Sequence, residues 1–532
     1  MTKDESMLYT RRGLKGATTA PHHLAAEAGA QILKEGGNAV EAMVAMAATI
    51  AVVYPHMNSL GGDGFWLIAE PGKEPIGIDA AGPAAALATL NSYADVRVIP
   101  TRGPRAALTV PGTISGWQAA LAHAAHWEGT MPLDVLLGDA LCRAREGFVV
   151  TRGQAELTAA KRAELADQPG FATTYLGKGS TEVGQVFRQP ELADTLEALI
   201  RDGLDSFYRG DLGQALGSGL EHLGSPLRRS DFEGQKARLI EPLKLRAYGG
   251  SLYAMTPPTQ GVSALMILGL FERLGITEAE SFAHIHGLVE ATKQAFILRN
   301  AHLADGPWMT QDPKTWLSPD ILDQLAAKIE PTRALPWPQD TKPGDTIWMG
   351  AADAEGRTVS FIQSTYWEFG SGCVPAATGV VIQNRGAGFT LAPAHPNALE
   401  PGKRPFHTLI PGLAKLADGS WLAYGNMGGE GQPQSQAAVF SRHAIFGQPL
   451  QTAITAPRWL LGRTWGEETT TLKLESRFDP ALIEALATAG HDVEILEPFT
   501  STMGHAGAVR VGPQGVFEAA TDPRSDGAAV VL

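Results

Sequence analysis

The residue types that most often carry chemistry are present in this chain of 532 residues, but most of them are poorly spaced for it. Two histidine groups, His22-His23 and His284-Ile285-His286, have no cysteine or carboxylate at metal-ligand spacing. Cys142 lies in an apolar stretch that predicts a packed helix, and Cys373 has no histidine nearby that would activate a thiolate. The sequence therefore predicts neither a metal centre nor a cysteine nucleophile.

A glycine-rich loop, Gly61-Gly62-Asp63-Gly64, has the composition of a phosphate cradle. Such a cradle needs a helix directly after the glycines, whereas Phe65–Ala69 reads as a buried strand. We interpret the loop as a tight turn into that strand, and we find no nucleotide-binding pattern elsewhere. No cofactor is predicted.

The elements that must position any site begin with two predicted helices. His23–Glu35 has apolar residues at helical spacing and stops at Gly36-Gly37. Asn38 and Glu41 then form a capping-box pattern for a helix over Ala39–Val53. That second helix is apolar on nearly every side, which predicts that it is buried.

Helices dominate the pattern up to about residue 330, and strands dominate after it. The clearest helical patterns cover Asp134–Arg145, Pro190–Asp202, Val262–Leu274 and Glu278–Arg299, and one predicted strand, Ser251–Met255, interrupts them. Later strands are predicted at Trp348–Ala352, Thr358–Ser364, Gly379–Gln383, Trp421–Tyr424, Leu472–Glu475 and Ala506–Val511.

The change from helices to strands coincides with a proline-rich segment at residues 330–345. Its prolines stand among polar residues, which predicts an exposed linker. Exposed linkers are where a proteolytic or autoproteolytic cut is best tolerated.

A series of short motifs resembles the γ-glutamyltransferase family of N-terminal-nucleophile hydrolases, in order and spacing, almost from end to end. The motifs are Gly36-Gly37-Asn38-Ala39-Val40-Glu41-Ala42, Tyr54-Pro55, Gly61-Gly62-Asp63-Gly64-Phe65, Pro111-Gly112-Thr113, Asp345-Thr346, Gly402-Lys403-Arg404-Pro405, Gly428-Gly429 and Asp522-Pro523-Arg524. Each motif is weak by itself, and their common order makes the resemblance specific.

The resemblance implies an α+β fold, a four-layer αββα sandwich made from one precursor that cleaves itself between Asp345 and Thr346. The large fragment, residues 1–345, would be helix-rich and end in the linker, and the small fragment, 346–532, would be strand-rich and carry the nucleophile. The two fragments would stay together as a heterodimer, with an (αβ)2 assembly left open.

By family position, Thr346 is expected to be the nucleophile and Ser364 the hydroxyl that orients it. A freed α-amino group has a pKa of about 7.7–8.0 and can take the proton of the threonine hydroxyl at neutral pH, whereas the amide nitrogen of the uncut chain is not basic. Gly428 and Gly429 are expected to supply backbone N–H donors for the oxyanion, where a Cβ would obstruct the substrate.

The substrate pocket departs from the γ-glutamyl pattern. Family members hold the glutamyl carboxylate with an arginine near an Asp-Phe-Arg-Glu stretch and a pair of serines, and they hold the amino group with an Asn, a Gln or Glu, and an Asp. The corresponding positions here are Asp79-Ala80-Ala81-Gly82, His407-Thr408, Tyr366, Arg385 and Gly388. Arg385 would repel a substrate ammonium, so the pocket does not suit glutamate.

Arg385 instead suits a planar carboxylate that carries no amino group, through bidentate pairing. We expect Tyr366, His407 and Gln363 to donate to the remaining oxygens, with Thr408 beside them, and the aromatic bulk of Tyr366 to favour a short acyl chain. Within the family the chain is most similar to the oxamate amidohydrolase branch, which splits oxamate into oxalate and ammonia in purine catabolism.

Two other functions compete with this one. The first is γ-glutamyl hydrolysis or transfer, for instance from glutathione, and the second is a non-catalytic relative that binds a ligand.

The net charge of −13 argues against a nucleic-acid partner. The longest apolar run, Ala42–Tyr54, is shorter than the roughly 20 residues that span a bilayer, and the first residues lack an apolar signal region. We therefore expect a cytoplasmic protein without a membrane partner.

Overall fold

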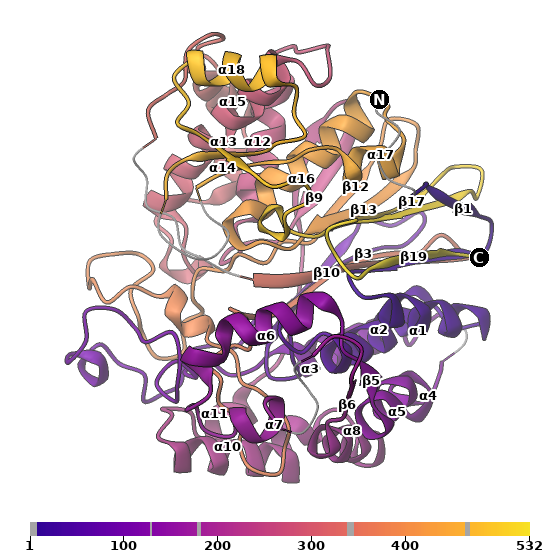
Figure 1. The fold of residues 1–532 in the computed structure, drawn as a ribbon, viewed down its shortest axis with the longest axis vertical. Helices are drawn as coiled ribbons and strands as arrows, with labels where there is room; N and C mark the ends of the chain where they lie inside the picture. The colour runs from indigo at the N-terminus through magenta and orange to yellow at the C-terminus, as the bar shows by residue number, and fades with distance from the viewer. Residues whose placement is uncertain (1–7, 128–129, 178–181, 338–344, 463–468) are drawn as a thin grey trace.

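Two stacked seven-stranded sheets, each covered on its outer face by helices, form the centre of the computed structural model (Figure 1). The structure describes residues 8–127, 130–177, 182–337, 345–462 and 469–532. This arrangement is the predicted four-layer αββα sandwich, and the prediction is confirmed.

The first sheet contains β10 and β11, the pair that begins at the predicted cleavage point. Its strands pair antiparallel in the order β19 (Ala528–Val531), β2 (Gly16–Ala20), β10 (Asp345–Asp353), β11 (Thr358–Tyr366), β3 (Asp63–Ala69), β4 (Ile76–Ala80) and β7 (Arg238–Ile240). Both predicted fragments contribute strands to it.

The second sheet lies over the first and is also antiparallel throughout. Its order is β1 (Arg11–Gly13), β18 (Phe517–Thr521), β17 (Ala506–Val511), β13 (Trp421–Asn426), β12 (Gly412–Lys415), β9 (Gly250–Ala254) and β8 (Leu243–Ala247). Here too, both predicted fragments contribute strands.

One helical layer covers the first sheet. Its principal helices are α1 (His23–Lys34), α2 (Ala39–Val53), α3 (Thr113–Ala124), α5 (Gly138–Glu146) and α8 (Pro190–Asp202), with α4 (Leu133–Leu136), α6 (Arg152–Leu165), α7 (Phe171–Tyr175), α9 (Ser206–Arg209), α10 (Asp211–Leu223), α11 (Arg229–Gly234) and the short pair β5 (Phe148–Val149) and β6 (Val186–Phe187) around them. Every residue of α2 is buried, and Asn38 and Glu41 form the predicted capping box. This burial follows from the apolar composition on all sides of α2.

The other helical layer covers the second sheet. It contains α12 (Gly261–Arg273), α13 (Phe282–His302), α14 (Pro313–Trp316), α15 (Pro319–Ala326), α16 (Gln432–Phe440), α17 (Leu450–Thr455) and α18 (Pro480–Thr488), with a small sheet of β14 (Trp459–Leu461), β15 (Leu472–Glu475) and β16 (Val493–Leu496). Figure 1 shows α12, α13 and α16 above the stacked sheets and α1 and α2 below them.

Trp348 on β10 sets the packing between the two sheets. Its indole is 2% exposed and donates from Nε1 to Ser360 Oγ (3.0 Å). The ring lies over glycines of the opposite sheet, since a Cβ added to Gly425 or Gly507 would come within 2.1 Å or 2.6 Å of it. Because Trp348 is two positions from Thr346, this contact fixes the start of β10 between the sheets.

Most predicted elements are confirmed within a few residues, and four expectations were wrong. Gly379–Gln383 forms no strand, because Gly61 packs against its backbone and leaves only an isolated bridge to Ile382. The helix predicted at Asp134–Arg145 is divided into α4 and α5. The helix predicted from Glu278 begins at Phe282, where Ser281 Oγ accepts the N–H of His284 (3.1 Å). Cys142 is exposed rather than packed.

The linker prediction is tested only in part, because residues 338–344 lie outside the described residues. Pro331, Thr332 and Arg333 are exposed as predicted, whereas Ala334 is buried and its N–H donates to Ala489 O (2.8 Å). Among the described residues, no helix is long and apolar enough to cross a membrane.

We expect Gly425→Ala to destabilise the fold, because the added methyl group would overlap the Trp348 indole between the sheets. Overpacking of this kind costs about 1–3 kcal/mol. The midpoint of urea-induced unfolding measures the loss, and Gly234→Ala, at the exposed end of α11 where an added Cβ meets no atom within 4 Å, is the control. Equal midpoints for the two variants would contradict the assigned role of Trp348.

Candidate active site

Thr346 lies at the start of β10 and faces the space between the two sheets. Alternate residues of a strand share a face, and Trp348, two positions after Thr346, belongs to the core between the sheets. Ile347 and Met349 face the helical layer instead. Thr346 is fully buried, and Gln432 at the first turn of α16 donates from Nε2 to its Oγ1 (3.3 Å). A side-chain amide at the start of α16 therefore orients this hydroxyl.

Ser364 on β11 faces the same inter-sheet space, and its Oγ accepts the backbone N–H of Tyr366 (2.7 Å). Tyr366 pairs with Asp345 across the strands and has a φ of 85°, a conformation that side chains rarely adopt. Strained backbone of this kind concentrates at functional sites. The predicted nucleophile, Ser364 and Tyr366 thus meet at one end of the β10–β11 pair.

Gly62 is required beneath this pair, because an added Cβ would lie 2.3 Å from Ser364 O. The glycine-rich loop that the sequence presents as a possible phosphate cradle therefore packs its backbone directly on β11. This is the turn into a strand that the sequence predicts.

Arg385 lies in a short 3-10 turn, Arg385–Gly388, and is fully buried. Its Nη1 donates to Thr408 Oγ1 (3.2 Å), and its guanidinium carbon lies 4.1 Å from the centre of the Tyr366 ring. Nε and Nη2 have no hydrogen-bond partner among the described residues. Burial lowers the pKa of Arg385 to about 10, so the group is positively charged at neutral pH.

The Nε and Nη2 donors form one edge of the guanidinium, the edge that pairs with a carboxylate through two parallel hydrogen bonds. A buried donor without a partner costs about 1–3 kcal/mol, and more when it is charged. The position of Arg385 is therefore most stable when an anion of carboxylate geometry lies against this edge.

His407 is buried beside Arg385 but has a different place from the one that the sequence predicts. Its Nδ1 accepts the N–H of Leu409 (3.4 Å), which leaves the proton on Nε2, where it points to Asp63 Oδ2 (3.2 Å). Burial, and then the charge of Arg385, hold the pKa of His407 well below its usual value, so the imidazole is neutral. Both ring nitrogens are engaged within the protein, which leaves no N–H for the predicted donation to substrate.

Asp63 is the site residue that sequence reasoning missed. It is fully buried, and its Oδ1 accepts from Gly82 N, Gly112 N and Gln383 Nε2, each at 3.1 Å. Burial raises the pKa of Asp63 to about 7, and the nearby charge of Arg385 opposes that rise. The available signal was an aspartate among glycines, which permits a close approach of backbone donors.

Gln363 lies on the wrong face of β11 for the predicted role. Its Nε2 donates to Asn58 Oδ1 (2.7 Å), and Asn58 in turn donates to Ile50 O and Tyr54 O at the end of α2. Successive strand residues point to opposite faces, so Gln363 faces the helical layer while Ser364 faces the inter-sheet space. Gln363 supports the strand from behind.

Gly428 and Gly429 form the turn between β13 and α16, with φ angles of 122° and 50°. Both angles lie in the region that favours glycine. The turn is connected to the nucleophile through Gln432, which follows it by three positions. Hydrogen bonds from Gln432 to Thr346, and from Gln260 to both Gly429 and Thr408, therefore connect this turn to the groups around the predicted nucleophile.

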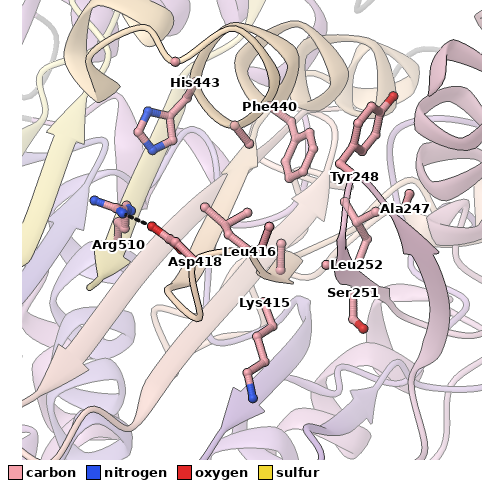
Figure 2. Close-up of a pocket in the computed structure, with 15 residues that line it drawn as sticks. Ala247, Tyr248, Ser251, Leu252, Lys415, Leu416, Asp418, Phe440, His443 and Arg510 are labelled. Carbon is pink, nitrogen blue, oxygen red and sulfur yellow. Dashed lines mark hydrogen bonds and ion pairs between the residues drawn. The ribbon is translucent and has the colours of Figure 1, made fainter. Parts of the chain in front are cut away.

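Other candidate groups lie elsewhere. The pKa of Cys373 is raised to about 11 by burial, so its thiol is neutral and unreactive at physiological pH. A surface cavity of about 350 Å³ lies at the turns that end β8 and β12, where Arg510 pairs with Asp418 (2.6 Å) (Figure 2). None of the predicted site residues lines it.

The structure also brings together three buried residues of the types that bind metals, His286, Glu290 and His491. Their proximity could not be predicted from the sequence. His286 and Glu290 lie one turn apart on α13, and His286 Nδ1 is 2.9 Å from His491 Nε2. Lys293 Nζ, however, already pairs with Glu290 Oε1 (2.7 Å). The ammonium supplies the positive charge that a metal ion would bring.

Comparison with known proteins gives matches along almost the whole chain. Residues 25–532 match the family described as gamma-glutamyltranspeptidase. An oxamate amidohydrolase proenzyme of Klebsiella pneumoniae is 53% identical over 516 residues, covering 97% of this chain and 98% of that protein. A glutathione hydrolase-like proenzyme of Bacillus subtilis, YwrD, is 39% identical over 524 residues, covering 97% and 98%.

Among solved structures, a cephalosporin acylase from Bacillus halodurans has the same architecture. Its TM-score is 0.91 at 30% identity, and the match covers 100% of this chain and 98% of that one. The likeness therefore extends over both sheets and both helical layers.

Chelation should leave the activity unchanged, because the ammonium of Lys293 already balances the carboxylate of Glu290. We expect purified enzyme dialysed against EDTA to keep its rate and to contain well under one equivalent of transition metal by elemental mass spectrometry. A stoichiometric metal, or a rate lost to EDTA and restored by zinc, would contradict this interpretation of the His286 cluster.

Proposed function

The chain belongs to the gamma-glutamyltranspeptidase family and is a hydrolase of C–N bonds in linear amides, and from that premise we propose that it is a self-cleaving threonine amidohydrolase that converts oxamate into oxalate and ammonia. The single observation that carries the choice of substrate is Arg385, buried with the Nε–Nη2 edge unpartnered among the described residues.

The proposed maturation cuts the bond between Asp345 and Thr346. Thr346 already stands in its sheet, paired through β10 with β2 and β11, so the cut requires no rearrangement of the strands. It converts a non-basic amide nitrogen into an α-amine, which can deprotonate the adjacent hydroxyl. The products are the large fragment, residues 1–345, and the small fragment, residues 346–532, held together as a heterodimer.

In the proposed reaction, Thr346 Oγ attacks the amide carbonyl of the substrate while its α-amine takes the hydroxyl proton. Backbone N–H groups of Gly428 and Gly429 stabilise the oxyanion, and loss of one such donor typically costs about 100- to 1,000-fold in rate. The α-amine then returns the proton to the departing nitrogen, which leaves as ammonia. Water, deprotonated by the same amine, hydrolyses the acyl ester and releases the acid.

The carboxylate of the substrate is proposed to pair with the free edge of Arg385, in the plane of the guanidinium, while the Tyr366 ring covers one face of that plane. Oxamate fits because its carboxylate is bonded directly to the amide carbonyl, which suits a buried anchor close to the nucleophile. A γ-glutamyl group does not fit, because its ammonium would approach the same positive charge. The oxamate amidohydrolase of Klebsiella pneumoniae supports this choice. The proposal places the reaction in purine breakdown, in the cytoplasm.

Thr346→Ala should remain a single chain on a denaturing gel, whereas the wild type should show two fragments, because only the hydroxyl of Thr346 can attack the preceding carbonyl. Intact-mass spectrometry should place the wild-type cut between Asp345 and Thr346. A cut elsewhere, or a Thr346→Ala protein that is processed and active, would exclude the proposed nucleophile.

Arg385→Met should lower kcat/KM for oxamate by at least about 100-fold, because it removes a charged bidentate partner of the substrate. Oxamide, which has an amide in place of the carboxylate, is the matched control substrate. The wild type should strongly prefer oxamate over oxamide, and Arg385→Met should lose that preference. Ammonia release measures both rates.

The rival activity is tested in the same preparation with a γ-glutamyl anilide. The arginine at this position predicts negligible turnover of the anilide. Faster turnover of the anilide than of oxamate, or an unchanged oxamate preference in Arg385→Met, would overturn the proposed substrate.

A further inference from the structure

We propose that Gln260, a residue of the large fragment, positions the Gly428–Gly429 turn for catalysis and that the buried Arg299–Glu430 ion pair holds both in place. This inference rests on the proposed function of the turn. Gln260 is a positioning residue, because it reaches the reacting groups only through the backbone of the small fragment.

The side chain of Gln260 is fully buried, and both the nitrogen and the oxygen of its amide form hydrogen bonds within the protein. Its Nε2 donates to Thr408 O and to Gly429 O, both at 2.9 Å. Its Oε1 accepts from Arg299 Nη1 (2.8 Å). One nitrogen therefore bridges two backbone carbonyls that are 21 positions apart in the chain and that belong to different parts of the proposed site.

The two bridged segments carry the two halves of the proposed binding geometry. The hydroxyl of Thr408 accepts a hydrogen bond from Arg385 Nη1. The backbone of Thr408 therefore belongs to the side of the site that would anchor the substrate carboxylate. Gly429 belongs to the side that stabilises the oxyanion. A planar amide with both of its hydrogens engaged fixes the spacing between the two sides.

The Arg299–Glu430 ion pair anchors this bridge from the second helical layer. Arg299 on α13 pairs through Nη2 with Glu430, the residue directly after Gly429, and the two side chains are 2% and 4% exposed. The guanidinium carbon of Arg299 also lies 3.7 Å from the centre of the Phe296 ring. Two successive residues of the turn, Gly429 and Glu430, are thus held by groups of the large fragment.

Such an anchor is needed because both glycines have positive φ and no side chain of their own to restrain them. Oxyanion donors act only when they lie about 2.7–3.1 Å from the developing charge. Removing the Gln260 bridge would free the turn and the Thr408 backbone together. It would therefore lower transition-state stabilisation more than ground-state binding, which still has the Arg385 charge.

The test compares Gln260→Met with a matched control, Gln189→Met, in processed enzyme. Gln189 is also buried and donates from Nε2 to a single carbonyl, Val52 O (2.8 Å), in the helical layer over the other sheet. We expect kcat for oxamate to fall by about 10- to 100-fold in Gln260→Met, with KM within about threefold of wild type. Self-cleavage, a single turnover, should still reach completion, and Gln189→Met should keep the wild-type kcat.

Gln260→Glu separates the two functions of the side chain, because a carboxylate retains the contact to Arg299 and loses both donors to the carbonyls. We expect its kcat to fall at least as far as that of Gln260→Met. Wild-type kcat in either variant, or a loss that appears mainly in KM, would overturn the inference and leave Gln260 with a structural role only.

Hydrogen–deuterium exchange gives a measurement that needs no substrate. Amides of residues 426–431 should exchange faster in Gln260→Met than in wild type or Gln189→Met, and unchanged protection there would also overturn the inference. If the wild type releases no ammonia from oxamate, the proposed function fails, while the exchange result still decides whether Gln260 restrains the turn.

Discussion

A positive charge buried at the centre of a protein is the constraint on which this site depends. Arg385 has no exposed surface, and its guanidinium is held by the Tyr366 ring on one side and Thr408 on another. Asp63 and the neutral His407 lie around it without filling its free edge. Under the proposed function, a substrate carboxylate would complete this pocket, so the charge of the substrate would matter before its shape.

The groups around Arg385 come from segments that are distant in sequence, and hydrogen bonds rather than loops join them. Gln432 connects α16 to Thr346, and Gln260 connects Thr408 to Gly429. Trp348 then fixes β10 against the opposite sheet. Side-chain amides are well suited to this purpose, because one planar group can satisfy several buried backbone atoms without adding charge.

Local patterns predicted most of the fold, since helix caps and apolar spacing act within a few residues. The capping box of α2 and the strand after the glycine-rich loop are confirmed, and the motif order identified the family. The failures within the candidate site concern long-range contacts. The direction of the His407 ring depends on Asp63, which is 344 positions away, and the face of Gln363 depends on the register of β11.

Gln260 and Gln432 were missed because neither carries a local pattern that separates a buried contact from a surface residue. Each is defined only by the partner that folding brings to it. The glycines around Asp63 were a signal, but they were interpreted only as a turn into a strand. The departures from the family pattern at Tyr366 and Arg385 could be recognised from the sequence, because the order of the motifs aligned each position with the residue that the family usually has there. The turn at Gly379–Gln383 was misread because its apolar residues are those of a strand, and only the approach of Gly61 decides otherwise.

Both sheets combine strands from before and after Thr346, and under the proposed cleavage this has a consequence for the life of the protein. After the proposed cut, neither polypeptide could keep either sheet complete by itself, because each sheet loses strands if one chain departs. The uncut chain can refold as one molecule, whereas the cut pair must first find each other, at an entropic cost of about 4–15 kcal/mol. Under the proposed cleavage, refolding is therefore harder for the processed pair than for the single chain, and the working lifetime of the enzyme would depend on how slowly the interleaved chains come apart.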